Sequence, residues 1–278
     1  MFLFLKRCII LFTYIFLDTK EVDIMSIIVT LIVTFFAGMG AGLGTGFAGM
    51  SAAAVISPML INFLAIEPYT AVGIALASDV LASAVSAYTY KKHGNLDVKN
   101  GSLMMGMVLL FTIVGSYVSS IVPAKTMGNF STVMTLLLGI KFILKPVMTT
   151  KNDMDAVSKR KKVLGSIFCG AMVGFICGFV GAGGGMMMLL ILTSILGYEL
   201  KTAVGTSVFI MTFTALTGAL SHFSFGNTPD TMVMILCILF TFLWARIAAV
   251  FANKAKPEVL NRVVGVVLTV LGIVILLF

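Results

Sequence analysis

The chain has 278 residues, of which 59% are hydrophobic and only 11% are charged, so it lacks the polar sequence that a soluble domain needs to cover its surface. The formal net charge of +8 comes from Lys and Arg residues in short clusters between apolar runs, a pattern that indicates membrane orientation rather than a nucleic-acid-binding surface. We therefore predict an all-α integral membrane protein that has the lipid bilayer as its partner and no nucleic-acid partner.

Residues 1–24 come before the first full-length apolar run. Their apolar stretch, Cys8–Leu17, is shorter than the roughly 17–25 residues that a spanning helix needs. A second methionine, Met25, stands directly before the first long run. We interpret residues 1–24 as a peripheral N-terminal extension that the membrane fold does not require.

Ten apolar runs follow this extension, and most of them reach the length of a spanning helix. The second and the seventh are shorter, and each comes after a glycine-rich stretch, so we expect each to be a half-helix or a re-entrant segment. Such irregular backbone is tolerated at membrane depth only where protein or a water-filled cavity surrounds it. The predicted fold class is a polytopic helical bundle with about 8–10 transmembrane segments. The ten runs cover residues 25–46, 49–65, 70–90, 102–121, 127–147, 163–181, 184–196, 202–223, 231–251 and 259–278.

The loops between the runs differ in charge, and this difference predicts the orientation of the chain. The 145–162 loop contains six Lys or Arg residues, and the 91–101 and 252–258 loops are also basic. The 224–230 loop contains neither Lys nor Arg. We expect the three basic loops to be cytoplasmic and the 224–230 loop to be external.

The chain contains an internal repeat at an offset of 132 residues, with the motif Thr-Ala-Val-Gly at 70–73 and again at 202–205. We divide the membrane domain into a first repeat (25–150), a cytoplasmic linker (151–162) and a second repeat (163–278). Each repeat holds five runs, an odd number, so the second repeat enters the membrane from the opposite side. Two inverted-topology repeats are typical of secondary transporters, whose substrates bind near the midplane between the repeats. Glycines spaced four apart also recur, as Gly38, Gly42 and Gly46 and as Gly170, Gly174 and Gly178.

Glycine-rich breaks lie at matching places in both repeats. In the second repeat the run Gly-Ala-Gly-Gly-Gly ends at Gly185, and consecutive glycines interrupt a helix and expose backbone N–H groups. At the start of the next half-helix such groups attract an anion. The first repeat has Gly-Met-Ser-Ala-Ala there, where Ser51 adds a hydroxyl. For the glycines spaced four apart in each repeat, by contrast, we expect close packing of another backbone on the helix face that they share. The candidate substrate-binding residues at the breaks are Ser51, Gly183, Gly184 and Gly185.

Thr206 and Ser207 follow the second Thr-Ala-Val-Gly motif and lie in the eighth run. Together with Ser78 in the equivalent helix, their hydroxyls could line a polar cavity. We therefore add Thr206 and Ser207 to the candidate substrate-binding residues. The alternative is that each hydroxyl donates to a carbonyl of its own helix.

Asp79 lies in the middle of the third run, where an ionisable group is costly and therefore points to function. It could carry a proton, bind a cation or pair with a buried base. Arg246 and Lys141, each inside an apolar run, are the bases that we consider as partners. We name Asp79 and Arg246 as candidate coupling or charge-bearing residues. The alternatives are a structural ion pair and a base whose head reaches the membrane interface.

Other chemistry finds little support in the sequence. All four cysteines lie inside apolar runs and no Cys-x-x-Cys occurs, so neither a disulfide framework nor a metal site is expected. No Gly-Lys-Ser/Thr follows the glycine-rich stretches, which argues against a Walker nucleotide site. An embedded enzyme would need clustered His, Asp or Cys residues within the spans. We therefore expect no cofactor, no metal and no enzymatic activity.

Several longer segments resemble a known family. The second half of the chain contains GFICGFVGAGGGMMM, YELKTAVGTSVF and ALTGALSHFSFGN, and the first half contains AGMGAGLGTGFAGMSAAAVISPML. With these segments the chain resembles the sulfite exporter TauE/SafE family of membrane permeases over about residues 25–278. The resemblance implies two homologous halves and the export or import of small anions, such as sulfite, sulfonates or related organic acids. The first repeat departs from the family pattern, because Ser51-Ala52-Ala53 replaces the usual glycine triplet.

The function that we expect is that of a secondary transporter or permease in the cell membrane. It would move a small anion by alternating access between the two inverted repeats. The alternative is a cation transporter or a channel that uses Asp79. Association into a homo-oligomer is left open.

Overall fold

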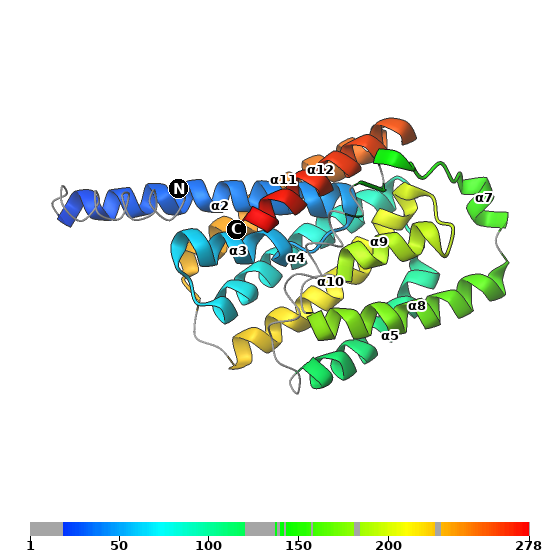
Figure 1. The fold of residues 1–278 in the computed structure, drawn as a ribbon, viewed down its shortest axis with the longest axis horizontal. Coiled ribbons are helices and arrows are strands. Elements are labelled where there is room, and N and C mark those ends of the chain that lie inside the picture. Colours follow the sequence, from blue (N-terminus) through cyan, green and yellow to red (C-terminus); the bar gives the residue numbers. More distant parts are fainter. Residues whose placement is uncertain are drawn as a thin grey trace.

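The computed structural model describes residues 19–119, 137, 140, 141, 143–156, 158–180, 184–225 and 229–277. All regular secondary structure in this part of the chain is helical, which confirms the predicted all-α fold class. Figure 1 shows the helices as an elongated bundle. In chain order they are α2 (Thr19–Ala48), α3 (Ala53–Leu64), α4 (Pro68–Lys92), α5 (Val98–Ser119), α7 (Lys151–Ala156), α8 (Lys159–Val180), α9 (Gly184–Ser194), α10 (Leu200–Phe225), α11 (Thr231–Lys254) and α12 (Pro257–Leu277).

The helices coincide with the predicted apolar runs. Nine of the ten runs correspond to a helix, and the fifth run, 127–147, falls mostly outside the described residues. Because α2 begins at Thr19, the first helix includes residues 19–24 of the predicted extension. Residues 1–18 of that extension lie outside the described part of the chain. The short helix α7 lies within the predicted linker.

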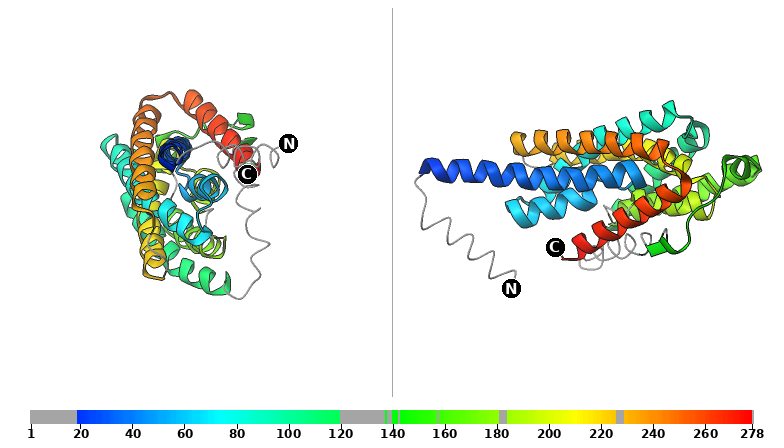
Figure 2. Two further views of the ribbon diagram at one scale, coloured as in Figure 1. Left: turned by 90° about the vertical axis from the view of Figure 1, so that its left-hand side faces the viewer. Right: turned by 90° about the horizontal axis from the view of Figure 1, so that it is seen from above.

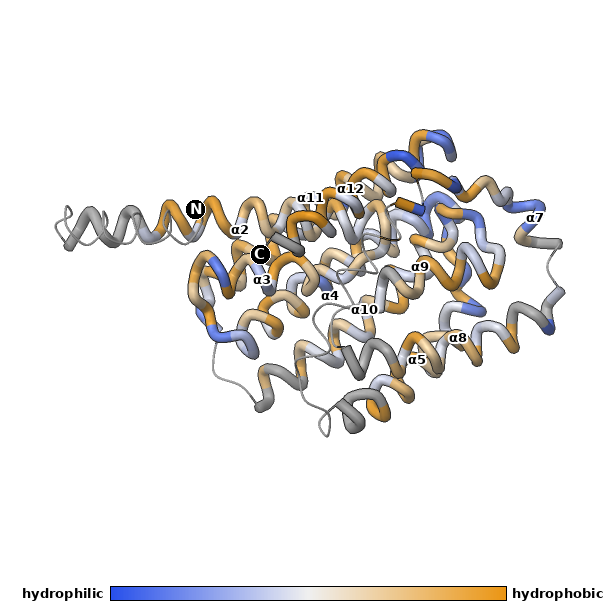
Figure 3. The backbone as a smooth tube through the Cα atoms, in the orientation of Figure 1, coloured by the Kyte–Doolittle hydropathy of each residue, from blue (hydrophilic) through white to orange (hydrophobic). Residues whose placement is uncertain are grey.

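The surface of the bundle fits a lipid environment. Large apolar side chains are exposed along the helices, with Ile113 at 73% and Phe168 at 68% exposure. Figure 3 shows hydrophobic residues along most of the helices and hydrophilic residues gathered toward their ends. Exposed apolar surface of this extent marks a membrane-embedded face, so the chain is a multi-pass membrane protein. Five described helices contain segments long and apolar enough to cross a membrane, namely Ser26–Ala48, Pro68–Lys92, Leu200–Leu220, Thr231–Lys254 and Pro257–Val274.

The helices α3 and α9 are the two short segments that the sequence predicted as half-helices. They have 12 and 11 residues, so they rise only about 18 and about 16 Å, well short of a hydrocarbon core roughly 30 Å thick. Each folds back along the helix before it. Gly40 of α2 lies beside Val55 of α3, and Gly165 of α8 lies beside Leu196, just after α9. The fold therefore contains two hairpins, each made of a long helix and a half-helix.

The repeated glycines bring two helices against partners from the other half of the sequence. Helix α2 packs on α11, where a Cβ on Gly42 would lie 2.6 Å from the Thr241 carbonyl oxygen. Helix α8 packs on α5, where a Cβ on Gly170 would lie 2.9 Å from the Met104 carbonyl oxygen. Figures 1 and 2 show both pairs running side by side. The predicted close helix packing at these glycines is thus confirmed, and both interfaces join the two predicted repeats. The glycines concerned are Gly38, Gly42 and Gly46 on α2 and Gly170 and Gly174 on α8.

The basic loops lie together at one end of the bundle, which we call the basic end. Lys151 Nζ donates to the Gly94 carbonyl oxygen (3.0 Å), and Asn95 Nδ2 donates to Asn253 Oδ1 (2.6 Å). These hydrogen bonds tie three loops that are far apart in the sequence. The predicted orientation requires the three basic loops to lie on the same side of the membrane, and they do lie together. The loops of the basic end are 91–101, 143–156 and 252–258.

Labelling of single cysteines tests this orientation. In a variant without the four native cysteines, a cysteine at Asp153 should be protected from an impermeant thiol reagent in intact cells, and a cysteine at Pro229 should react. The reason is that Asp153 belongs to the basic end, whereas Pro229 precedes α11 in a loop without Lys or Arg. Permeabilised cells provide the control, because both sites should then react. Labelling of both positions from outside would contradict the predicted orientation.

Helix α4 positions the candidate site. Its start is fixed by the Glu67 side chain, which accepts hydrogen bonds from the backbone N–H groups of Tyr69 (3.0 Å) and Thr70 (2.9 Å). This N-cap satisfies two backbone donors that the helix itself cannot. The helix then packs against α3, α10 and α11. Its middle, including Asp79 and Ser83, is buried among them.

Candidate functional site

The two glycine-rich breaks meet inside the bundle. The first is the link of residues 49–52, where Gly49 adopts a left-handed backbone (φ 61°) that ends α2. Gly185, in the first turn of α9, packs directly on this link. A Cβ on Gly185 would lie 3.1 Å from the Ser51 nitrogen and would overlap the Gly49 carbonyl oxygen. The structure thus brings Ser51 and Gly185, two candidate residues far apart in the sequence, to one place.

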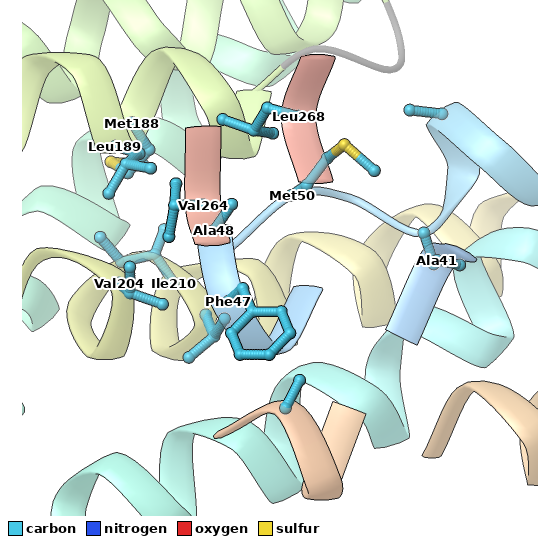
Figure 4. Packing of buried hydrophobic residues seen from close by; sticks show 14 of the residues in the cluster. Ala41, Phe47, Ala48, Met50, Met188, Leu189, Val204, Ile210, Val264 and Leu268 are labelled. Carbon is cyan, nitrogen blue, oxygen red and sulfur yellow. The ribbon is translucent and has the colours of Figure 1, made fainter. Parts of the chain in front are cut away.

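The first break is enclosed by protein. Met50 is fully buried, and its carbonyl oxygen accepts a hydrogen bond from Thr45 Oγ1 (2.8 Å). Figure 4 shows Met50 on the link between two helices, within an apolar cluster that includes Leu268 of α12 and Leu189 of α9. Irregular backbone is tolerated at membrane depth only where it is enclosed in this way or lines a cavity.

Asp79 reaches the first break from α4. Its Oδ2 accepts a hydrogen bond from Ser51 Oγ (2.8 Å), and its Oδ1 accepts one from Ser83 Oγ (2.8 Å). The backbone N–H of Ala52 also interacts with the carboxylate. Since α3 begins at Ala53, the carboxylate lies at the N-terminus of this half-helix, where the helix dipole favours negative charge.

The two bases that we considered as partners of Asp79 lie elsewhere. Lys141 Nζ donates to the Ser194 hydroxyl at the end of α9, and Arg246 is exposed on α11. In the described part of the chain the Asp79 carboxylate contacts serine hydroxyls and backbone in place of a base. The physical reason is that two hydroxyl donors and a helix N-terminus supply the positive potential that a base would have supplied.

Thr206 and Ser207 take different positions. Ser207 lies at the breaks, where its Oγ packs directly on Gly49 and donates to a carbonyl of its own helix (3.2 Å). Thr206 faces α5, and its Oγ1 accepts a hydrogen bond from the Asp97 backbone N–H (3.2 Å). The structure therefore brings Ser207 to the other candidate residues and places Thr206 at the start of α5.

The second break is described from Gly184 onward. Gly184 and Gly185 are buried and are the first residues of α9, whereas Gly183 lies outside the described residues. The first backbone N–H groups of any helix have no acceptor within that helix. Helix α9 therefore directs its donor end at the first break, beside Ser51.

Two serines that the sequence analysis did not single out extend the site along α4. Ser83 and Ser86 follow Asp79 at spacings of four and seven, which places all three on one helix face, and this spacing was the signal available in the sequence. Ser86 Oγ is buried and has no hydrogen-bond partner among the described residues. An unsatisfied buried polar group costs about 1–3 kcal/mol, so Ser86 is a costly residue for packing alone.

The site is closed to solvent in this structure. Ser51 is 5% exposed, and Asp79 and Ser207 are 0% exposed. Glycine at position 185 and three short polar side chains surround a place where two backbones are in contact. A solute can enter only if the breaks separate, and it would then meet backbone N–H groups, hydroxyls and one carboxylate.

The sequence is similar to those of known membrane proteins over most of its length. The sequence model of the family described as Sulfite exporter TauE/SafE matches residues 34–275. The chain is 22% identical to the "Probable membrane transporter protein YdhB" of Bacillus subtilis over 230 residues, which is 83% of this chain and 94% of that protein. It is 26% identical over 220 residues to a probable membrane transporter protein of Methanocaldococcus jannaschii, covering 74% of this chain and 79% of that protein. A further relative, the "Probable membrane transporter protein YunE" of Bacillus subtilis, is 21% identical over 244 residues, covering 81% of this chain and 89% of that protein.

Proposed function

Because the chain belongs to the sulfite exporter TauE/SafE family of membrane transporters, we propose that it moves a small anion across the cell membrane as a secondary transporter. The anion would bind where the two breaks meet. The observation that carries the proposal is the contact of Gly185 with Gly49 and Ser51. It brings a half-helix N-terminus from each half of the chain to one buried place.

Broken helices suit an anion for a physical reason. An intact helix uses its backbone N–H groups internally, whereas the first turn of a half-helix presents free donors and the positive end of a dipole. Discontinuous helices serve this purpose in several transporter folds. The donors here are the first N–H groups of α9. The hydroxyls of Ser51 and Ser207 donate to Asp79 and to the Val204 carbonyl oxygen in the closed site, and they would rotate toward an anion once the site opens. These groups match the oxygens of a small oxyanion better than a bulky or apolar solute.

Alternating access follows from the closed site. The α2–α3 and α8–α9 hairpins contribute one break each, so a movement of one hairpin relative to the other opens the site. The glycine-lined pairs α2–α11 and α5–α8 pack closely enough to move as units. Inverted repeats would make the inward-open and outward-open states equivalent by symmetry.

A second candidate function rests on the oxygens around Asp79. A carboxylate with two serine hydroxyls is also a ligand set for a small cation, so a cation transporter or channel is the alternative. In that case α9 would contribute packing rather than donors. The two functions differ in the sign of the charge that moves.

Uptake by the purified chain in proteoliposomes tests the proposal. Sulfite, methanesulfonate and acetate should be tested as anions, with labelled Na⁺ and K⁺ as cations and protein-free liposomes as the control. We expect saturable uptake of at least one sulfur oxyanion and no net cation flux in its absence. Cation flux without anion uptake would favour the alternative. The absence of any saturable anion uptake would contradict the proposed function.

A further inference from the structure

We infer that Asp79 binds the co-transported proton, and that it does so each time an anion binds at the N-terminus of α9. The inference rests on the proposed function and deepens it, because it names the coupling ion and the residue that holds it. The geometry that carries it is the chain of contacts from Gly185 to Ser51 and from Ser51 to Asp79.

The N-terminus of α3 is a position where a free anion could bind, and the Asp79 carboxylate occupies it. The carboxylate caps the start of α3, where Ser51 Oγ and the Ala52 N–H point toward it. A free anion at this place would have to displace it. The N-terminus of α9 is the equivalent position in the other half, and it lies against the same link. The anion is therefore expected at α9, with Asp79 as its immediate neighbour.

Charged groups that could neutralise Asp79 are absent from its described surroundings. Asp79 is 0% exposed, and the elements packed against α4 are α2, α3, α10 and α11. Helix α3 has no ionisable side chain, and the charged residues of α2 lie in its first five positions. None of the described ionisable side chains on the remaining elements contacts the carboxylate. The described ionisable side chains on α4 itself, α10 and α11 are Tyr69, Tyr88, Tyr90, Lys91, Lys92, Lys201, Cys237, Arg246 and Lys254. The side chain of His222, also on α10, lies outside the described residues.

Two negative charges cannot share this place at low cost. Charges inside a protein interact far more strongly than in water, and a like charge nearby favours the neutral form of a carboxyl group. An arriving anion therefore drives Asp79 to take up a proton. By linkage the reverse also holds, because the protonated carboxyl group strengthens the binding of the anion by the same factor.

The coupling step is a proton transfer. One proton from the aqueous phase on the entry side binds a carboxylate oxygen of Asp79, and the resulting carboxylic acid releases it to the exit side together with the anion. The Ser51 and Ser83 hydroxyls now donate to the two oxygens. Because a hydroxyl both donates and accepts, either serine can rotate and accept the new O–H. Ser86, one turn further along the same face, offers the next hydroxyl toward the basic end.

Transport of methanesulfonate tests the inference, because a sulfonate stays ionised across the pH range used and cannot mimic proton coupling by its own titration. In proteoliposomes of the wild-type chain, uptake of methanesulfonate should raise the internal proton concentration, as read by a trapped pH dye. An inward proton gradient should drive accumulation. The apparent affinity for methanesulfonate should rise by about tenfold for each pH unit of acidification, over the pH range in which one proton is taken up with each anion.

Asp79→Asn keeps the size of the side chain and removes its charge. This variant should exchange internal for external methanesulfonate, show little change of affinity with pH, and lose accumulation driven by a proton gradient. The matched control is Thr89→Ala, since Thr89 lies on the same helix and donates to the Val85 carbonyl of that helix (2.7 Å). The control should keep the wild-type pH dependence.

Distinct results would overturn the inference and the proposed function. Methanesulfonate transport without proton flux, or with unchanged pH dependence in Asp79→Asn, overturns the inference alone, and so does strict dependence on Na⁺. Failure of the wild-type chain to move any tested anion overturns the proposed function.

Infrared spectroscopy of the wild-type protein keeps the inference testable in every case. A pH step should produce a carboxylic-acid C=O band that Asp79→Asn lacks, and its absence from the wild type would exclude protonation of Asp79.

Discussion

Gly185→Ala should lower transport strongly. The new Cβ would overlap the Gly49 carbonyl oxygen and lie 3.1 Å from the Ser51 nitrogen. Both neighbours are backbone atoms, so neither can rotate away, and the two breaks must move apart. Overpacking of this kind costs about 1–3 kcal/mol, which corresponds to about 5- to 150-fold in an equilibrium or a rate.

The effect of Gly185→Ala should appear in transport before it appears in folding, because the strain is confined to the place where the breaks meet. Uptake into proteoliposomes at equal protein content measures it. Gly106→Ala is the matched control, since Gly106 is a helical glycine with no atom within 4 Å of the position of its Cβ. It should transport like the wild type. Equal transport by Gly185→Ala and Gly106→Ala would move the substrate site away from the breaks.

Gly42→Leu should disrupt the folded structure. A Cβ at this position would lie 2.6 Å from the Thr241 carbonyl oxygen and 2.7 Å from Trp244 Cβ, and leucine adds three further carbon atoms. Helices α2 and α11 would have to separate along their length. Within a bilayer such pairs are held mainly by close packing, since lipid tails compete equally for apolar surface. We therefore expect loss of most of the monodisperse, folded protein.

Size-exclusion chromatography and thermal unfolding in detergent measure the effect of Gly42→Leu. Insertion into the membrane should persist, because leucine raises the hydropathy of the segment. This separates failed packing from failed insertion. Gly106→Leu, again at an uncrowded glycine, should elute and unfold like the wild type. A wild-type elution profile and unfolding midpoint for Gly42→Leu would show that the α2–α11 contact is dispensable.

The helices could be predicted because the lengths of the apolar runs and the positions of the glycines are visible in the sequence itself. The run at 70–90 became α4 (Pro68–Lys92), and the short runs at 49–65 and 184–196 became half-helices. Spanning length and glycine content are local properties, so a single sequence shows them. The spacing of Gly38, Gly42 and Gly46 likewise indicated a close contact.

The partners of these segments could not be predicted, because they depend on tertiary packing. The four-residue spacing of Gly42 from its neighbouring glycines indicates close contact with another backbone, but it does not identify Thr241 as the residue in contact. The same applies to Asp79. Its burial was predicted, but the serine donors in place of Lys141 or Arg246 depend on how α3 and α4 lie together. Thr206 and Ser207 are adjacent in sequence, yet helix geometry turns one toward α5 and the other toward Gly49.

The pairing of α2 with α11 has a consequence for biosynthesis. The ribosome completes α2 early, but its partner helix emerges only after most of the chain has been made. Until then the glycine face of α2 lacks the helix that it packs against, whereas α8 follows much sooner after its own partner α5. Helix α2 must therefore wait in the membrane, shielded by lipid or by the insertion machinery, until α11 has been inserted. In a truncated product that lacks α11, helix α2 would have no helix to pack against. Such fragments are therefore expected targets for membrane quality control.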